Sequence, residues 1–290
     1  MSMIAWNCRG LGAAATIRKL GDIVRDERPL LVFLSKTKCG KFRIDCIKER
    51  LGMFGVGIPA KGKSGGLALL WDKSVCVQLR SFSSNHIDAD VITDCESVNW
   101  RFTGFYGEPD VTRRKTTWEL LKRLSMQSDA PWLCVGDYNE VLFQYKKTGA
   151  LRQQWQMNDF RLALEQSGLS DLGFRGPLFT WCNRREHPHT ILARLDRACG
   201  NASWLARFPT TTVTHHLSPY FDHAILVIYR DRLDTTVRTK KKSRFRFEAK
   251  WLQSEECGVV VEEACDGVTE VDPNYRLWLK VQACRVRLLQ

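Results

Sequence analysis

Polar residues follow short apolar runs at six places in this sequence, and these places are spread over most of the chain. The apolar runs have the length and the alternation typical of β-strands. Strands of packed sheets end at shared edges, so polar residues at those ends can meet at one rim although they are distant in sequence. The chain must fold so that these segments converge: residues 6–10, 33–38, 105–107, 136–140, 194–197 and 221–223.

The order of apolar and amphipathic segments predicts an α/β fold. Helices are expected over residues 16–27, 113–126 and 155–167, where apolar residues recur at helical spacing and breakers such as Pro29 and Gly168 follow. Mixed strands with interspersed helices favour two packed sheets with helices on both outer faces. The expected strands are residues 4–8, 30–34, 54–58, 66–71, 75–81, 86–92, 100–106, 132–135, 178–183, 191–196, 211–215 and 224–229.

Composition and charge narrow the class of protein. The chain has 290 residues, 44% of them hydrophobic, enough for a substantial core, and no stretch approaches the ~20 apolar residues of a membrane span. A net charge of +12 and a pI near 9.3 favour a polyanionic partner, with nucleic acid first. Eleven cysteines without a Cys-x-x-Cys pair, and no secretory leader, indicate a reducing compartment, nuclear or cytoplasmic.

Two of the six segments contain residue pairs suited to phosphate ester hydrolysis. Asp137 and Asn139 stand two apart after the strand 132–135, so extended geometry would turn both side chains to the same side. One can orient water while the other donates to a phosphate. His223 follows Asp222, and a histidine can act as general base when another acid fixes its tautomer. Each pair alone is common in polar turns, so only their joint occurrence carries the prediction.

The order and spacing of the six segments resemble the endonuclease/exonuclease/phosphatase superfamily. Gly-Asp-Tyr-Asn at residues 136–139 is similar to the family signature, and Asp196 resembles the acid that orients the histidine, here His223. The connecting residues 65–71 and 104–107 resemble the endonuclease domains of plant LINE-type, non-LTR retrotransposons. The resemblance implies a deoxyribonuclease I-like fold, a four-layer α/β sandwich of two packed mixed β-sheets flanked by helices.

The resemblance also implies roles for further residues. Asn7 would either orient the phosphate or lie close to a metal ion, Mg²⁺ with Mn²⁺ as a possible substitute. Asp222 would lie close to the same ion, and Tyr106 would contact the scissile phosphate of DNA. Arg184 and Arg185 belong to the loop 183–189, which should open at the same rim. They would either hold a nucleic-acid backbone or form an exposed basic hairpin tip.

Lys36 stands where the family has a glutamate, the main carboxylate ligand for magnesium. An ammonium ~4 Å from a divalent ion, at an effective dielectric of ~20, adds repulsion on the order of 8 kcal/mol as an upper bound. A third of that would weaken metal binding about a hundredfold. We therefore expect impaired turnover, and we hypothesise that Lys36 takes the cation's place among Asp137, Asp196 and Asp222.

Taken together, the residues and the resemblance predict a metal-dependent, DNA-nicking endonuclease that Lys36 impairs. Residues 1–230 would form this domain. Residues 231–290 would be a basic linker and a helical segment leading toward a reverse transcriptase, which is absent; residues 230–250 contain nine Lys or Arg against three acids. Two alternatives stay open: a catalytically inactive nucleic-acid-binding remnant, and a phosphatase or phosphodiesterase that acts on small phosphorylated substrates.

Overall fold

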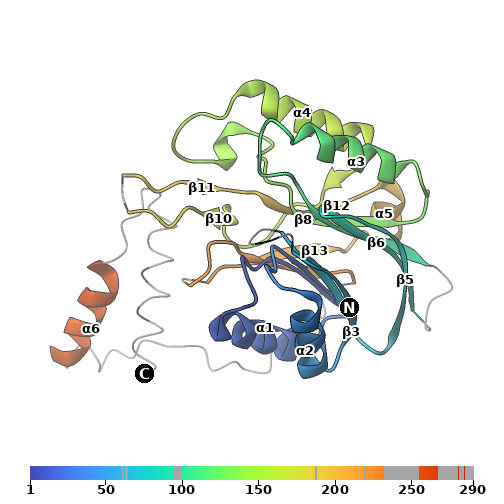
Figure 1. The fold of residues 1–290 in the computed structure, drawn as a ribbon. Coiled ribbons are helices and arrows are strands. Elements are labelled where there is room, and N and C mark those ends of the chain that lie inside the picture. The colour runs from blue at the N-terminus through green and yellow to red at the C-terminus, as the bar shows by residue number, and fades with distance from the viewer. Residues whose placement is uncertain are drawn as a thin grey trace.

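The computed structural model describes residues 1–60, 62, 65–93, 99–186, 188–218, 220–231, 255–266, 280 and 284. Within these residues, two six-stranded β-sheets pack against each other, and helices cover the outer face of each sheet (Figure 1). Helices α1 and α2 lie on one side of the sandwich, and α3 and α4 lie on the other. The expected four-layer α/β sandwich is confirmed.

The first sheet places the N-terminal strand near its centre. Its strand order is β13-β14-β1-β2-β4-β3, in which β1 and β2 are parallel and the other neighbours are antiparallel. Helices and the second sheet cover its two faces, which explains near-continuous apolar strands such as β2. The strands are β1 (Ser2–Asn7), β2 (Leu31–Ser35), β3 (Phe54–Ile58), β4 (Leu67–Trp71), β13 (Thr212–His216) and β14 (Ile225–Tyr229).

The second sheet has the order β5-β6-β7-β8-β12-β9, and its one parallel pair, β7 with β8, brings both carboxyl ends to the same edge. A short hairpin, β10 (Trp181–Cys182) with β11 (Leu192–Ala193), lies apart from this sheet. The strands are β5 (Val75–Phe82), β6 (His86–Thr93), β7 (Trp100–Tyr106), β8 (Trp132–Asp137), β9 (Ser170–Asp171) and β12 (Asp196–Gly200).

Each outer helix buries one apolar stripe. In α1, Ile17, Leu20 and Ile23 recur at helical spacing and pack on the first sheet. In α3, Trp118 and Leu121 pack on the second sheet in the same way. The helices are α1 (Ala14–Glu27), α2 (Lys41–Leu51), α3 (Lys115–Ser125), α4 (Gln154–Gln166), α5 (Ala202–Arg207) and α6 (Glu255–Asp266), with a 3₁₀ turn at Gln144–Lys146.

The inner faces of the two sheets form the main core. Phe33 and Leu69 of the first sheet meet Phe102 and Leu133 of the second, and all four side chains are fully buried. Gly104 lets the sheets approach closely, because a Cβ at this position would lie 2.1 Å from the Phe33 ring. Close packing of β2 against β7 holds the strand ends of the two sheets near each other.

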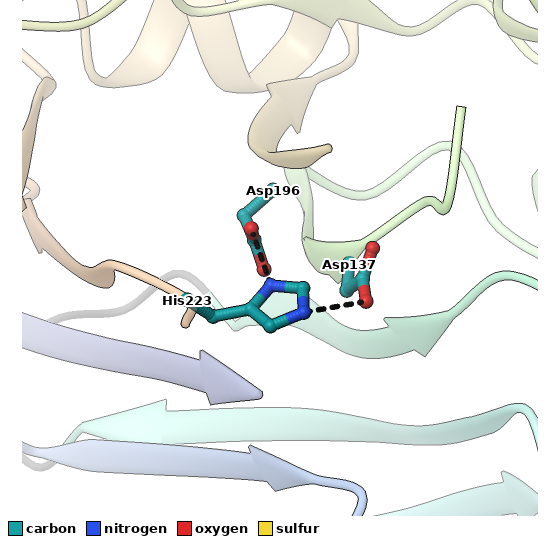
Figure 2. Close-up of side chains that lie close together, drawn as sticks. All are labelled: Asp137, Asp196 and His223. Carbon is teal, nitrogen blue, oxygen red and sulfur yellow. Dashed lines mark hydrogen bonds and ion pairs between the residues drawn. The ribbon is translucent and has the colours of Figure 1, made fainter. Parts of the chain in front are cut away.

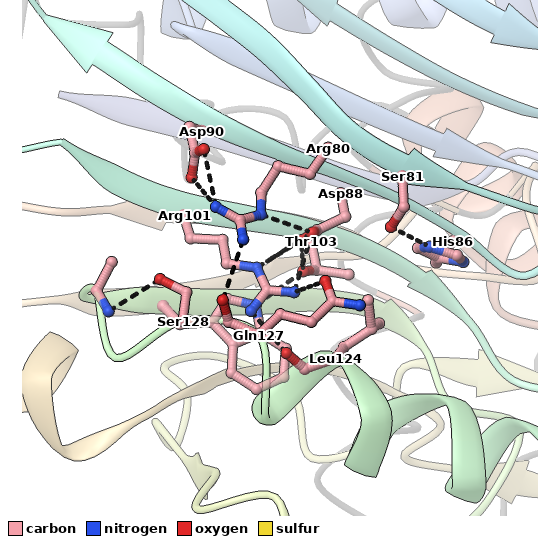
Figure 3. Close-up of polar contacts among 12 residues, drawn as sticks. Arg80, Ser81, His86, Asp88, Asp90, Arg101, Thr103, Leu124, Gln127 and Ser128 are labelled. Atoms are coloured by element: carbon pink, nitrogen blue, oxygen red, sulfur yellow. Dashed lines mark hydrogen bonds and ion pairs between the residues drawn. The ribbon is translucent and has the colours of Figure 1, made fainter.

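A buried ion pair joins β6, β7 and α3 on the outer face of the second sheet (Figure 3). The Arg101 Nε atom donates to Asp88 at 2.9 Å, and neither side chain is exposed to solvent. The Thr103 hydroxyl also donates to Asp88, and the Arg101 guanidinium reaches the Leu124 carbonyl at 2.7 Å. The pair therefore fixes the two strands to the helix that covers them.

Several local predictions differ from the structure. The expected strand 191–196 is divided between β11 and β12, and β12 continues to Gly200. The expected strand 178–183 is reduced to β10. Helix α2 was not expected, because Ile44 and Ile47 are its only fully buried side chains among mostly charged neighbours. The strands 54–58 and 100–106 have the expected bounds.

The region after residue 231 is described only in part. Helix α6 falls within the helical segment that was expected there, whereas the basic linker and most of the following residues lie outside the described residues. The division of the chain at residue 230 stays a prediction. In the part of the chain that the structure describes, no helix combines the length and apolar character of a membrane span.

Candidate active site at the strand ends

Strand pairing brings most of the candidate residues together. In the second sheet, Tyr106 is in register with Asp137, and Asp137 is in register with Asp196. In the first sheet, Asn7 ends β1, and His223 comes two residues before β14, the neighbour of β1. These residues therefore meet at one edge of the sandwich, where strand ends of both sheets lie next to each other.

A hydrogen-bonded network links four of them. Figure 2 shows the His223 imidazole between two carboxylates: its Nδ1 lies 2.9 Å from Asp196, and its Nε2 lies 3.9 Å from Asp137. The Asn7 amide nitrogen donates to Asp137 at 2.8 Å and lies 3.1 Å from the His223 Nε2 atom. All four side chains are buried. This is the histidine–acid pair expected from the sequence, with Asn7 connecting its far side to Asp137.

The network determines which atoms of the His223–Asp196 pair carry a proton. Burial acts to lower the pKa of His223, but the charges of Asp196 and Asp137 outweigh it and raise that pKa. Burial raises the pKa of the Asp196 carboxyl. A neutral imidazole protonated on Nδ1 donates to Asp196 and leaves Nε2 able to accept from Asn7. Nε2 is then the ring atom that can take up a proton.

Asn139 reaches Asp137 differently from the sequence prediction. The extended geometry expected across Asp137 and Asn139 is wrong, because Asn139 has a left-handed backbone with φ 55°. The turn directs its backbone N–H to the Asp137 carboxylate at 2.8 Å, and its side chain donates to the Gly107 carbonyl at 2.7 Å. Asn139 thus positions Asp137 and joins the ends of β7 and β8.

The Tyr106 hydroxyl is a buried donor near this network. Only 5% of the residue is exposed, and no hydrogen bond to its hydroxyl meets strict geometry within the described residues, although the Asn139 side chain interacts with it. Burial, and next the charge of Asp137, raises the pKa of this phenol, so the hydroxyl keeps its proton. A buried hydroxyl without a well-formed hydrogen bond costs free energy, and a phosphate oxygen would satisfy it.

Lys36 lies beside the network without joining it. Its backbone is left-handed, with φ 55°, and its ammonium lies 5.8 Å from the centre of the Tyr106 ring. Lys36 forms no ion pair with any described residue, so the hypothesised contact with the three aspartates is not present. Burial lowers the pKa of Lys36, and the charge of Asp137 opposes that shift. Asp222 is instead ion-paired with Arg9.

Asp137, Asp196 and His223 offer ligand atoms within 4.8 Å of one another, so this cluster could hold a metal ion. Of the two expected magnesium ligands, Asp222 is not part of this cluster, whereas the Asn7 amide contacts both Asp137 and His223. Magnesium requires open oxygen positions around an octahedron. Both oxygens of Asp137 already accept hydrogen bonds, and His223 occupies an oxygen of Asp196.

The charges nearby are also unfavourable to a divalent ion. Arg9 holds Asp222, the one further carboxylate that was expected as a ligand. Lys36 adds a second positive charge next to Asp137. The residues present therefore fit magnesium poorly.

A pocket of about 340 Å³ opens beside His223. It contains basic residues that the sequence analysis had not selected. Arg114 and Arg152 both pair with Glu140, a buried residue directly after the Gly-Asp-Tyr-Asn motif. The position of Glu140 directly after this motif was the only feature of the sequence that pointed to Arg114 and Arg152. The lining residues are Arg9, Lys36, Pro109, Val111, Arg114, Asn139, Lys147, Arg152, Trp181, Ile191, Ala193, Leu195 and His223.

The two arginines of the 183–189 loop lie differently. Arg184 lines a second groove that shares Arg9 with this pocket, and its guanidinium donates to the Tyr220 carbonyl. Arg185 is exposed on the same loop, and its backbone N–H donates to Asn183. Arg184 is thus placed next to the candidate site. The nucleic-acid contacts of both residues stay a prediction.

Comparisons with known proteins agree with this architecture. A family model described as "Endonuclease/Exonuclease/phosphatase family" matches residues 4–219. The endonuclease domain of TRAS1, a telomere-specific non-LTR retrotransposon, has a TM-score of 0.61 at 16% identity, covering 80% of this chain and 99% of that chain. A search of curated proteins returned no match.

Two further solved structures are similar. The 3'-5' exonuclease NExo from Neisseria meningitidis has a TM-score of 0.62 at 16% identity, covering 80% of this chain and 100% of that chain. The AP endonuclease LMAP from Leishmania major has a TM-score of 0.62 at 18% identity, covering 80% and 88%. At these identities the likeness shows the deoxyribonuclease I-like fold. Since the family model covers most of the chain, this protein belongs to the endonuclease/exonuclease/phosphatase family.

Proposed function

We propose that this protein is a DNA-nicking endonuclease domain of plant LINE-type retrotransposon origin, with turnover reduced by Lys36. The observation that carries the proposal is the network of His223, Asp196, Asp137 and Asn7. It places a histidine with a fixed tautomer, a carboxylate and an amide around one point beside a basic pocket. The fold likeness to the TRAS1 endonuclease domain supports the retrotransposon origin.

In this proposal, each residue has one task in water attack on a phosphodiester. Asp137 orients the attacking water. His223, held in position by Asp196, uses its Nε2 atom to accept a proton or to stabilise the charge on the phosphate. Asn7 and Tyr106 donate to the non-bridging phosphate oxygens, where negative charge develops. Asn139 holds Asp137 in position. Magnesium, or manganese in its place, is the expected cofactor, and the poor fit of its ligands is the physical reason for low turnover.

The test is plasmid nicking in magnesium, in manganese and in chelator. We expect weak nicking by the native chain and stronger nicking by Lys36→Glu, because one ammonium is exchanged for a ligand carboxylate. Relief of a third of the ~8 kcal/mol repulsion corresponds to about a hundredfold tighter metal binding. The double variant Lys36→Glu/His223→Ala is the control for contaminating nucleases and should lose nicking. Equal activity of the native and Lys36→Glu chains would contradict the role of Lys36.

A second candidate function is nucleic-acid binding without catalysis. It is favoured by one observation: the expected metal ligand Asp222 is ion-paired with Arg9, and the Lys36 ammonium lies 5.8 Å from the centre of the Tyr106 ring beside the network. Salt-sensitive DNA binding, together with no nicking by either the native chain or Lys36→Glu at millimolar metal, would select this function.

A further inference from the structure

The pocket beside His223 has an unusual charge for a metal site. Among the described residues, its lining contains five basic side chains and no acidic one: Arg9, Lys36, Arg114, Lys147 and Arg152. The acids of the hydrogen-bonded network lie behind this surface. A ligand that enters the pocket therefore meets positive charge first.

The five basic residues differ in how their charge is compensated. Arg114 and Arg152 share the buried carboxylate of Glu140, so this group keeps about one net positive charge. The Lys147 ammonium donates to two backbone carbonyls, at Thr148 and Ala150. Arg9 is half-exposed and pairs with Asp222. Lys36 has no ion-pair partner in the described part of the chain.

The position of Lys36 explains what it can bind. The residue follows β2, whose last residue, Ser35, is in register with Asn7. Its half-buried ammonium lies over the Tyr106 ring. An anion in the pocket would compensate this ammonium. A phosphate group provides several acceptor oxygens, enough for contacts with both Lys36 and Arg9 of the pocket lining.

We propose that Lys36 and Arg9 hold a phosphate of a nucleic-acid strand directly, so that the site binds DNA without a divalent cation. The inference rests on the proposed function, because it uses the same site and substrate. Lys36 has no ion-pair partner among the described residues and Arg9 is shared with Asp222, so the two side chains contribute a net charge of about +1, and they provide no Lewis acid for catalysis. DNA binding is retained and turnover is reduced.

Arg9 also gives the strand a path beyond the pocket. The adjoining groove shares Arg9 with the pocket and contains Lys38 and Arg184 as well, with Asp222 as its one acid among the described residues. The phosphate held by Lys36 is therefore followed by further basic side chains in the direction of the 183–189 loop. Successive phosphates of one strand fit this row better than a single small phosphorylated molecule.

The experiment measures fluorescence anisotropy of a short labelled DNA duplex in EDTA and in magnesium. The native chain should bind equally well in both. Lys36→Gln should bind about tenfold more weakly in EDTA, with a salt slope lower by about one, because one phosphate contact is lost. Lys36→Glu should lose more affinity in EDTA and recover part of it in magnesium.

Lys73→Gln is the matched control. The Lys73 ammonium lies 5.9 Å from the Phe54 ring, nearly the geometry of Lys36 over Tyr106, but past the opposite end of the same sheet. Its substitution should leave the EDTA affinity and the salt slope unchanged. A change equal to that of Lys36→Gln would show that only net charge matters and would overturn the proposal.

A second measurement uses a ligand that is too small to contact the rest of the basic surface. Inorganic phosphate in EDTA should raise the melting temperature of the native chain more than that of Lys36→Gln. DNA binding that requires magnesium in the native chain would refute the inference and leave the proposed nuclease function standing. Chelator-resistant binding without any nicking would refute the nuclease function alone.

Discussion

The buried pair of Arg101 and Asp88 gives a stability prediction whose size follows from the structure (Figure 3). Asp88 accepts hydrogen bonds from Arg101 at 2.9 Å and from the Thr103 hydroxyl at 2.5 Å, with no solvent access. Asp88→Asn keeps the volume of the side chain but leaves the Arg101 charge buried without a counter-charge. Breaking a buried pair in this way costs about 3–5 kcal/mol, which agrees with the loss of two charge-assisted hydrogen bonds at ~1.5–3 kcal/mol each.

The assay is urea unfolding of the native and variant chains, supported by thermal unfolding. For a domain of this size, each kcal/mol shifts the melting temperature by roughly 2–4 °C, so Asp88→Asn should lower it by about 6–20 °C. Asp90→Asn is the matched control, because Asp90 lies on the same strand and pairs with Arg80 at 2.9 Å, but both side chains are 28% exposed. Such an exposed pair contributes about 0–1 kcal/mol.

Two outcomes would refute this reasoning. The first is a loss for Asp88→Asn no larger than that for Asp90→Asn, since burial would then not set the energy. The second is a loss of DNA binding at a temperature where Asp88→Asn is still folded, because the substitution should affect stability and not the candidate site. Thr103 and Arg101 lie on the outer face of the second sheet, whereas Tyr106, which belongs to the candidate site, packs in the core between the sheets.

Two further predictions concern the core. Burial lowers the pKa of His215 to about 4, because a second proton would add a buried charge, and the hydrogen bond from Nδ1 to the Pro177 carbonyl opposes this shift only in part. Between about pH 6.5 and 4 the unfolded chain binds a proton that the folded chain does not, so stability should fall by roughly 3 kcal/mol as pH drops, and His215→Phe should flatten this dependence of the urea midpoint. Gly104→Ala should lower the unfolding free energy by about 1–3 kcal/mol or more, since its methyl would overlap Phe33. Gly21→Ala, inside α1 with no described atom within 4 Å of the added carbon, is the control and should raise it by about 0.5–1 kcal/mol.

The residues of the network were predicted from the resemblance to a known family, together with the apolar strands that several of them adjoin. Asn7, Asp137 and His223 adjoin β1, β8 and β14, and these strands are almost fully buried. The polar residues at the ends of these strands could be located in the sequence without knowledge of any side-chain contact. The sheet order itself then brings the ends together, since β1 pairs with β14 and β8 pairs with β12.

Other parts could not be predicted because their partners are distant or uncommon. The ion pair of Arg9 with Asp222 joins residues 213 positions apart, and neither residue signals the other locally. Strand β12 contains Arg197, which is fully buried although its type is usually exposed. The structure supplies the reason: Arg197 donates to the Glu140 carbonyl at 2.8 Å and lies 3.5 Å from Asp171.

The network also explains why Lys36 is compatible with an intact fold. Two buried carboxylates close to each other would ordinarily need a cation to offset their repulsion. Here His223 donates to Asp196, while Asn7 and the backbone of Asn139 donate to Asp137, so protein donors compensate both acids. The strand ends can therefore form the site without an ion. In the proposed function, Lys36 therefore affects metal affinity and turnover, while the architecture and the basic pocket are preserved.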